Sequence, residues 1–111
     1  MNEIKFYRGD SYPIEIVIWE NSREGKLLDI TGSTFLLTVS SEQNPKDITN
    51  QLFSISGTII NYDQSRVQFE PSALNTNLKP GEYWYDITMI NNLKHRTIVK
   101  DRFIILQDIT K

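Results

Sequence analysis

The 111-residue sequence contains no cysteine and a single histidine, His95. Without cysteine there is no disulfide bridge, no thiolate zinc ligand and no thiol nucleophile. His95 follows a run of turn-forming residues, and neither a carboxylate nor a nucleophile stands beside it to form a catalytic set. We therefore predict a protein that is not an enzyme, has no catalytic residue, and stabilises its core by packing alone.

Long apolar runs and a strong net charge are also missing. A run such as Ile104-Ile105-Leu106 is far shorter than the about 20 residues that cross a bilayer, so we expect no membrane span. The N-terminus lacks a basic region followed by an apolar stretch, so no secretory signal peptide is expected. The net charge of -2 argues against nucleic-acid binding, which needs clustered cations.

Metal and cofactor sites have no sequence signature. The aspartates are isolated from one another, and no closely spaced acidic loop of the calcium-binding kind occurs. No glycine-rich phosphate-binding loop occurs either. We therefore expect neither a metal nor a cofactor.

Alternation of inward and outward residues is the strongest pattern present, and it is clearest in residues 78–90. A Pro80-Gly81 turn leads into a strand in which Tyr83 and Tyr85 fall on one face and Trp84 on the other. A tyrosine soon after a turn, entering a late strand, is typical of the tyrosine corner in immunoglobulin-like sandwiches. There the ring is buried and the hydroxyl bonds to upstream backbone. We predict that Tyr83 is such a corner.

Strand-like runs recur every ~8–15 residues along the rest of the chain, which is the all-β pattern. The further runs are 4–8, 12–19, 33–40, 52–56, 58–62, 66–70 and about 96–106. Pro71 and the residues after it allow at most one helical turn near 71–78. The inward parity breaks in the last run, and a bulge near Lys100-Asp101 would explain the break. We predict that residues 1–111 form a single immunoglobulin-like antiparallel β-sandwich of about seven to eight strands.

A candidate interface lies on the expected outer face. Trp19 and Trp84 have the parity opposite to the core, and Leu36 and Ile90 also point outward in this arrangement. Two tryptophans with several aliphatic residues would form an unusually apolar patch, and tryptophan is enriched at interface centres. These four residues are therefore predicted to form a protein-binding surface. The alternatives are that the rings lie flat over adjacent strands, or that one bulge shifts the parity so that these residues do not face outward.

A carbohydrate-binding or host-adhesion module on the same sandwich is the second functional hypothesis. In that case Trp84 or Trp19 would stack against a sugar ring, with Asp86 and Asn91 holding its hydroxyls. The prediction is a glycan-binding face rather than a protein-binding one.

A basic cluster on the last hairpin has two interpretations. It could meet an acidic partner surface. The more ordinary interpretation is a solvated edge, where lysine discourages pairing between sheets. Its members are Lys94, His95, Arg96, Lys100 and Arg102.

Three pieces of the sequence, in their order, resemble a known family. They are 6–11 leading into 14–18, then 28–35, then 67–72 followed by 78–87. The order resembles the immunoglobulin-like N-terminal domain of tailed-phage baseplate upper proteins and related small virion proteins. In that family an Arg/Gly-Asp turn opens the second strand, an Asp-aliphatic-Thr-Gly turn opens the third, and a Gly-x-Tyr-x-Tyr-Asp corner starts the penultimate one.

The resemblance spans roughly residues 6–106 and implies a structural role without catalysis. The partners it implies are other phage structural proteins, in a homo-oligomer or a larger symmetric assembly, with no nucleic acid and no membrane. The implied location is the virion, assembled in the host cytoplasm. Baseplate upper proteins usually continue into further domains, so a small accessory of the tail, baseplate or head fits this length better.

The same motifs have scaffold roles in physical terms. Gly32 and Gly81 are expected to take backbone angles that cost other residues energy. Asp10 and Asp29 are expected to cap turns. Tyr83 is the corner, and these assignments explain a fold more than they locate a binding site.

Overall fold

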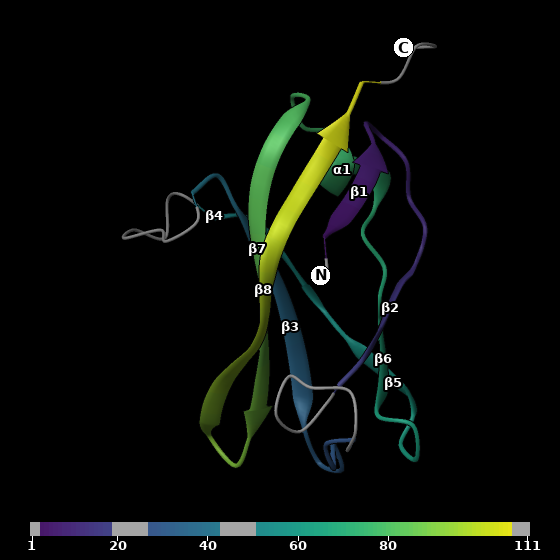
Figure 1. Cartoon of the computed structure of the whole chain (residues 1–111), viewed down its shortest axis with the longest axis vertical. Helices are drawn as coiled ribbons and strands as arrows, with labels where there is room; N and C mark the ends of the chain where they lie inside the picture. Colours follow the sequence, from purple (N-terminus) through teal and green to yellow (C-terminus); the bar gives the residue numbers. More distant parts are fainter. Residues whose placement is uncertain (1–2, 19–26, 43–50, 108–111) are drawn as a thin grey trace.

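The protein is an all-β sandwich, as predicted, in a computed structural model that describes residues 3–18, 27–42 and 51–107. The described residues form eight strands and one short helix (Figure 1). Their bounds are β1 Ile4–Tyr7, β2 Ile14–Val17, β3 Thr34–Ser40, β4 Gln51–Ser56, β5 Thr58–Asn61, β6 Arg66–Phe69, α1 Ala73–Thr76, β7 Gly81–Asn91 and β8 Lys94–Leu106. No helix in these ranges is long and apolar enough to cross a membrane.

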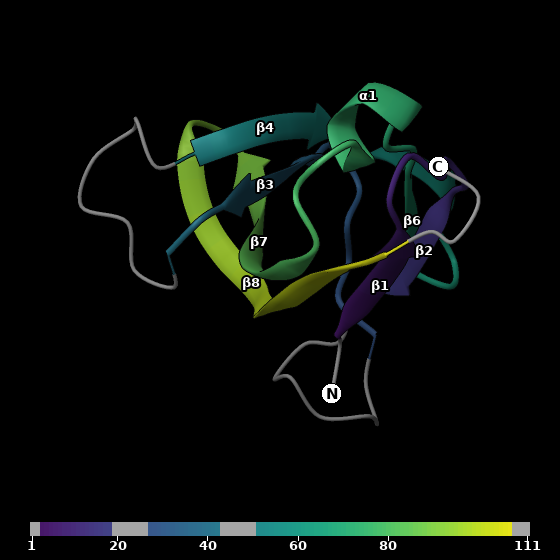
Figure 2. The same ribbon diagram turned by 90° about the horizontal axis from the view of Figure 1, so that it is seen from above.

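Two sheets make the two layers. One has five strands in the order β1-β8-β7-β3-β4, and the other has three in the order β2-β6-β5. All pairs are antiparallel except β1 with β8, which run parallel. Seen from above, the two layers enclose a common interior (Figure 2). This order is consistent with an immunoglobulin-like topology, in which the chain crosses from one sheet to the other several times.

The core lies between the sheets and is built from alternate residues of the strands. Its middle is formed by inward residues of β3, β7 and β8, which face those of β6. The fully buried apolar residues are Phe6, Ile18, Ile30, Phe35, Leu37, Val39, Val67, Phe69, Tyr85, Ile87, Phe103 and Ile105. Buried and solvent-facing side chains alternate along these strands, because every second side chain points into the core and is removed from water.

Tyr83 lies near the start of β7, where the chain enters its long central strand. Its hydroxyl donates a hydrogen bond of 2.6 Å to the backbone carbonyl of Lys79, four residues upstream. The ring is half-buried and packs against the core. Gly81 precedes it with φ of 154°, which L-residues rarely adopt. The hydrogen bond and the glycine together set the direction in which β7 begins.

Tyr85 occupies the next inward position of β7, with only 2% of its surface exposed. Burial raises the pKa of its hydroxyl, and the charge of Asp101 raises that pKa further. The unfolded chain ionises near pH 10, whereas the folded protein keeps the buried hydroxyl neutral. The free energy of unfolding is therefore expected to fall above about pH 10, by up to about 1.4 kcal/mol per pH unit.

Urea unfolding between pH 7 and 11 measures this alkaline loss. Tyr85→Phe should reduce it, since phenylalanine cannot ionise in either state. Tyr62→Phe is the matched control because the Tyr62 ring is 58% exposed. An alkaline slope that is the same in the Tyr85→Phe protein would contradict the prediction.

The two aspartates that were predicted to cap turns make different hydrogen bonds, Asp29 through its side chain and Asp10 through its backbone. The Asp29 carboxylate accepts a hydrogen bond of 3.0 Å from the backbone N–H of Thr31, and this bond lowers the pKa of Asp29. Gly32 follows with φ of 77°. Asp10 acts through its backbone, whose carbonyl accepts from the Thr76 hydroxyl at 2.6 Å and so joins the turn after β1 to α1.

The bulge in β8 lies at a different residue from the predicted one. The break was expected near Lys100-Asp101, but Ile98 is the extra residue, because Ile87 pairs with Val99 and Thr88 pairs with Thr97. Asp101 keeps the inward register, opposite Tyr85. A charge at an inward position therefore did not require a break in the strand there.

Candidate functional site

The predicted interface residues on β3 and β7 lie on the outer face of the five-stranded sheet. Trp84 pairs with Ser40 and Ile90 pairs with Thr34, and both pairs have the parity opposite to the core. Leu36 shares this face, and all three apolar side chains are half-buried. The fourth member of the predicted set, Trp19, lies outside the described residues.

Polar residues separate Trp84 from the other two. The pair of Thr38 and Asp86 stands between the Trp84 position and that of Leu36 along the strands. Asp86 is itself partly buried, and this desolvation raises its pKa, while the charge of Lys100 lowers it. The outer face is thus mixed, with apolar residues at both ends and a polar row across the middle.

The residues proposed to hold a sugar do not share one surface. Asn91 has the inward parity of β7, whereas Trp84 and Asp86 have the outward parity. The Asn91 side-chain amide also donates a hydrogen bond of 2.9 Å to the Ser33 hydroxyl. A ligand on the outer face would meet Trp84 and Asp86 without Asn91.

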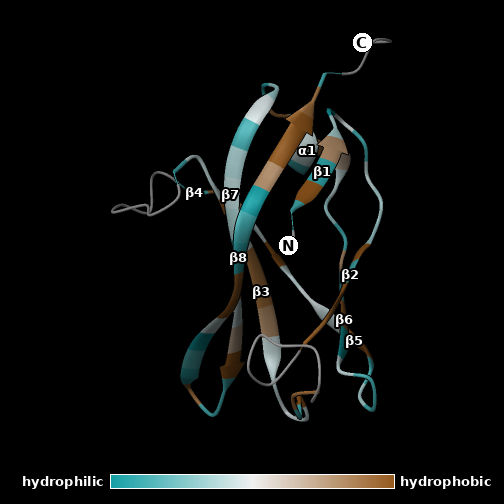
Figure 3. Ribbon diagram, in the orientation of Figure 1, coloured by the Kyte–Doolittle hydropathy of each residue, from teal (hydrophilic) through white to brown (hydrophobic). Residues whose placement is uncertain are grey.

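The basic cluster divides into two parts. Arg102 donates to the Glu82 carboxylate at 3.1 Å and forms an ion pair with Glu3. The hydrogen bond to Glu82, with the Glu3 charge second, raises the pKa of Arg102. The end of β8 next to the turn is strongly hydrophilic (Figure 3). The other members of the cluster are all exposed and lie before the part of β8 that pairs with β1. They are Lys94, His95, Arg96 and Lys100.

The tip of the β7–β8 hairpin carries a leucine in an unusual position. Asn91 and Lys94 are paired, so the turn consists of Asn92 and Leu93, with φ of 49° and 66°. Two-residue turns with both φ angles positive usually place glycine second, and a side chain there costs about 1–2 kcal/mol. Leu93 is nevertheless 93% exposed, so its side chain gains nothing from the fold that would offset this cost.

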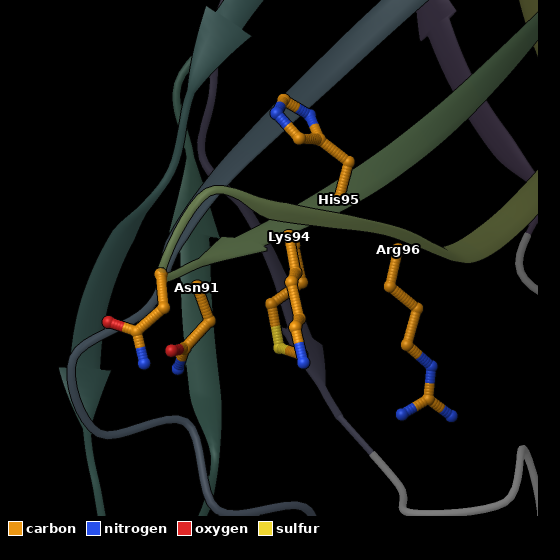
Figure 4. A pocket seen from close by; sticks show the side chains of 6 residues that line it. Asn91, Lys94, His95 and Arg96 are labelled. Atoms are coloured by element: carbon orange, nitrogen blue, oxygen red, sulfur yellow. The ribbon is translucent and has the colours of Figure 1, made fainter.

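A pocket borders the same hairpin and is lined, among the described residues, by both of its strands. Lys94 and Arg96 extend on one side of the hairpin and His95 on the other, as alternation requires (Figure 4). No carboxylate occurs between Thr88 and Ile98. The tip is therefore a protruding apolar residue with cationic neighbours.

A leucine among turn-forming residues is the feature of the sequence that points to this tip. The two asparagines predict a hairpin loop over residues 91–95, but Asn91, Lys94 and His95 belong to the strands, and only Asn92 and Leu93 form the turn. Leucine has no turn preference of its own. Leu93 neither favours the turn nor packs in the core, so the fold does not explain its presence there. Such a residue is a reason to look for a function.

No group of three or more potential metal-ligating side chains gathers in the part of the chain that the structure describes. Comparisons with protein-family models and with curated proteins found no match to this chain.

Proposed function

We propose that the protein is a non-enzymatic structural protein of a tailed-phage particle. In this role it is an accessory of the tail, baseplate or head that docks onto other particle proteins in a symmetric assembly formed in the host cytoplasm. The support is the ordered set of turn and strand motifs that resembles the immunoglobulin-like domain of baseplate upper proteins. The two-sheet sandwich is the fold that this resemblance implies.

The observation that carries the docking role is the Leu93 tip. Backbone strain retained at an exposed position is expected where a partner supplies the compensating contact. A protruding leucine fits an apolar recess, and the positive charge of Lys94 beside it favours an acidic surface around the recess. The partner chemistry that fits the tip is thus an acidic protein surface with an apolar hole.

Particle purification tests the function directly. Phage particles would be collected from an infected host that produces this chain and banded on a density gradient. The fractions would then be probed with an antibody against the purified protein. The chain should band with the particles at a constant ratio to the capsid protein. Recovery only in the soluble fraction, with particles free of it, would remove the proposal.

Three substitutions at Leu93 separate docking from folding. Leu93→Gly should raise the free energy of unfolding by about 0.5–1 kcal/mol, because relief of strain exceeds the entropy that glycine adds to the unfolded chain. It should at the same time reduce incorporation into particles by about tenfold, the effect of losing one well-buried apolar anchor. Urea unfolding and quantitative blotting of the gradient fractions measure the two effects.

Leu93→Ala and Leu93→Met are the matched controls. Alanine keeps the positive φ and its strain but lacks the anchor, so incorporation should fall without a gain in stability. Methionine keeps the apolar reach and should be incorporated normally. Equal incorporation of all four proteins would show that the tip does not dock.

The carbohydrate-binding alternative gains no support from this geometry. Its stacking residue Trp84 is half-buried, and Asn91 faces the other side of the strand and is already hydrogen-bonded. No observation favours it over docking to protein.

A further inference from the structure

Most free sheet edges in the described chain carry a feature that prevents another strand from pairing. On β1 the backbone carbonyl of Lys5 accepts a hydrogen bond of 2.7 Å from the Tyr12 hydroxyl, so the edge is partly capped by its own chain. β2 follows Pro13 and contains Glu15. β5 has four residues and an irregular register with β6. These are the known ways to protect an edge.

Where β8 extends beyond β1, its outer edge has no neighbouring strand in the described chain and is protected by charge. Between the turn and the residues that pair with β1 it carries Lys94, Arg96 and Lys100, all exposed. Charged residues on an edge discourage strand addition. This function agrees with the more ordinary interpretation of the basic cluster.

β4 is the exception. It closes the five-stranded sheet on the side opposite β1 (Figure 2), and its six residues, QLFSIS, include no charge and no proline. Its one irregularity against β3 lies near its first residues, between Val39 and Ser40 on the partner strand. From Phe53 to Ser56 the strand is regular and uncharged, and no strand of the described residues pairs with its outer side.

The backbone direction on this edge follows from one hydrogen bond. The Gly57 N–H donates to the Phe35 carbonyl at 2.8 Å, and Leu36 pairs with Ser56. Backbone groups in an antiparallel ladder point alternately toward and away from the partner strand. The N–H and C=O groups of Ser54 and Ser56 therefore point away from β3, toward the free edge.

We propose that β4 pairs with β4 of a second copy of this chain, antiparallel about a two-fold axis at Ser54. In this register the two Ser54 residues exchange both backbone hydrogen bonds, since their free groups face each other. Phe53 of each copy then lies opposite Ile55 of the other. The two five-stranded sheets become one continuous sheet of ten strands, and the contact is self-complementary, as a two-fold axis requires.

The register also completes the burial of two core residues. Phe53 and Ile55 pack against the core but remain half-exposed, whereas their neighbours Leu37 and Val39 on β3 are fully buried. The difference arises because nothing in the described chain stands beside β4 on its outer side. A second β4 would place an apolar residue next to each of them at the spacing of a cross-strand pair.

A single pair of edges is smaller than a typical stable interface, so the free chain is expected to associate weakly. Copies held close together in an assembly would pair much more tightly, because their effective concentration is high. This inference deepens the proposed symmetric assembly and rests on it for its biological setting. The pairing itself is tested on the purified chain alone.

A cysteine at the axis tests the register, and the natural absence of cysteine makes the experiment clean. Ser54→Cys places two thiols directly opposite, with Cβ atoms about 5 Å apart. In the Ser56→Cys control the two thiols are about 14 Å apart, since four residues separate them along the strand. A bifunctional maleimide too short for the second distance should crosslink Ser54→Cys at least tenfold faster at high protein concentration. Equal rates, or no crosslinking of either protein, would overturn the proposal.

Charge exchange at the same residue gives an independent result. Ser54→Lys and Ser54→Asp should each be monomeric in sedimentation equilibrium, because like charges meet at the axis. An equimolar mixture should form a heterodimer. A dimer that persists in either variant alone, or a mixture that stays monomeric, would show that another surface is used. The Ser54 hydroxyl lies 3.1 Å from that of Thr38 in an exposed pair, so circular dichroism should show both variants folded.

The two proposals fail separately. A chain that is found in particles but never crosslinks through Ser54→Cys would overturn the edge pairing and leave the proposed function standing. A chain that crosslinks as expected but is absent from particles would overturn the proposed function and leave the edge pairing standing.

Discussion

Gly57→Ala should lower the free energy of unfolding by about 2–3 kcal/mol, the range for overfilling a packed core. Gly57 stands between β4 and β5, where the chain passes from one sheet to the other. A Cβ added there would lie 2.7 Å from Phe69 Cε1 and 2.8 Å from Val67 Cγ1. Both neighbours are fully buried and cannot move aside without disturbing the core. Urea unfolding measures the loss.

Gly32→Ala is the matched control for this glycine. Nothing lies within 4 Å of a Cβ added at Gly32, but its φ is 77°, so only backbone strain is introduced, about 1–2 kcal/mol. A double-mutant cycle of Gly57→Ala with Val67→Ala should show favourable coupling, because the smaller side chain makes room for the added methyl group. A Gly57→Ala protein as stable as the parent would mean that the crossing is looser than these distances indicate.

The strand pattern could be predicted from the sequence because the two faces of a strand differ in their access to water. Tyr85 and Ile87 are inward in β7 because burial of alternate residues is what holds the sheet to its partner. In the sequence, Gly57 separates the strand-like runs 52–56 and 58–62, a pattern that fits one bent strand with a bulge as well as two strands. That it marks the crossing between sheets depends on which strands pair, and local pattern does not contain this information.

The surfaces were harder to predict, for physical reasons. A bulky residue with positive φ is disfavoured, so propensity argues against the angle that Leu93 takes. Its place in the turn depends on the register between β7 and β8, which shifts by one residue at the bulge at Ile98. Likewise, the outward-pointing backbone of Ser54 depends on β3 being its partner. Both features depend on which residues pair between strands, and the propensities of single residues do not determine that pairing.

Replacing a buried aromatic residue of the core by alanine is expected to lower the free energy of unfolding more than the same replacement of any surface residue. Phe103→Ala should lower the free energy of unfolding by about 4 kcal/mol, near the middle of the range for a buried phenylalanine. Phe103 is fully buried on β8, with its ring centre 5.8 Å from that of Phe6 on β1 and 6.0 Å from that of Phe53 on β4. Its removal therefore leaves a cavity that borders both ends of the five-stranded sheet.

A domain of this size has a total stability of roughly 5–15 kcal/mol, so Phe103→Ala should shift the urea midpoint strongly. Phe103→Leu keeps most of the volume and should lose less than half as much. Tyr12→Ala removes a ring stacked 4.1 Å from Phe6 but 48% exposed, and it should cost about 1 kcal/mol. If Phe103→Ala lowered the free energy of unfolding no more than Tyr12→Ala does, the prediction would be wrong. The ring contacts that join β8 to β1 and β4 would then contribute little to stability.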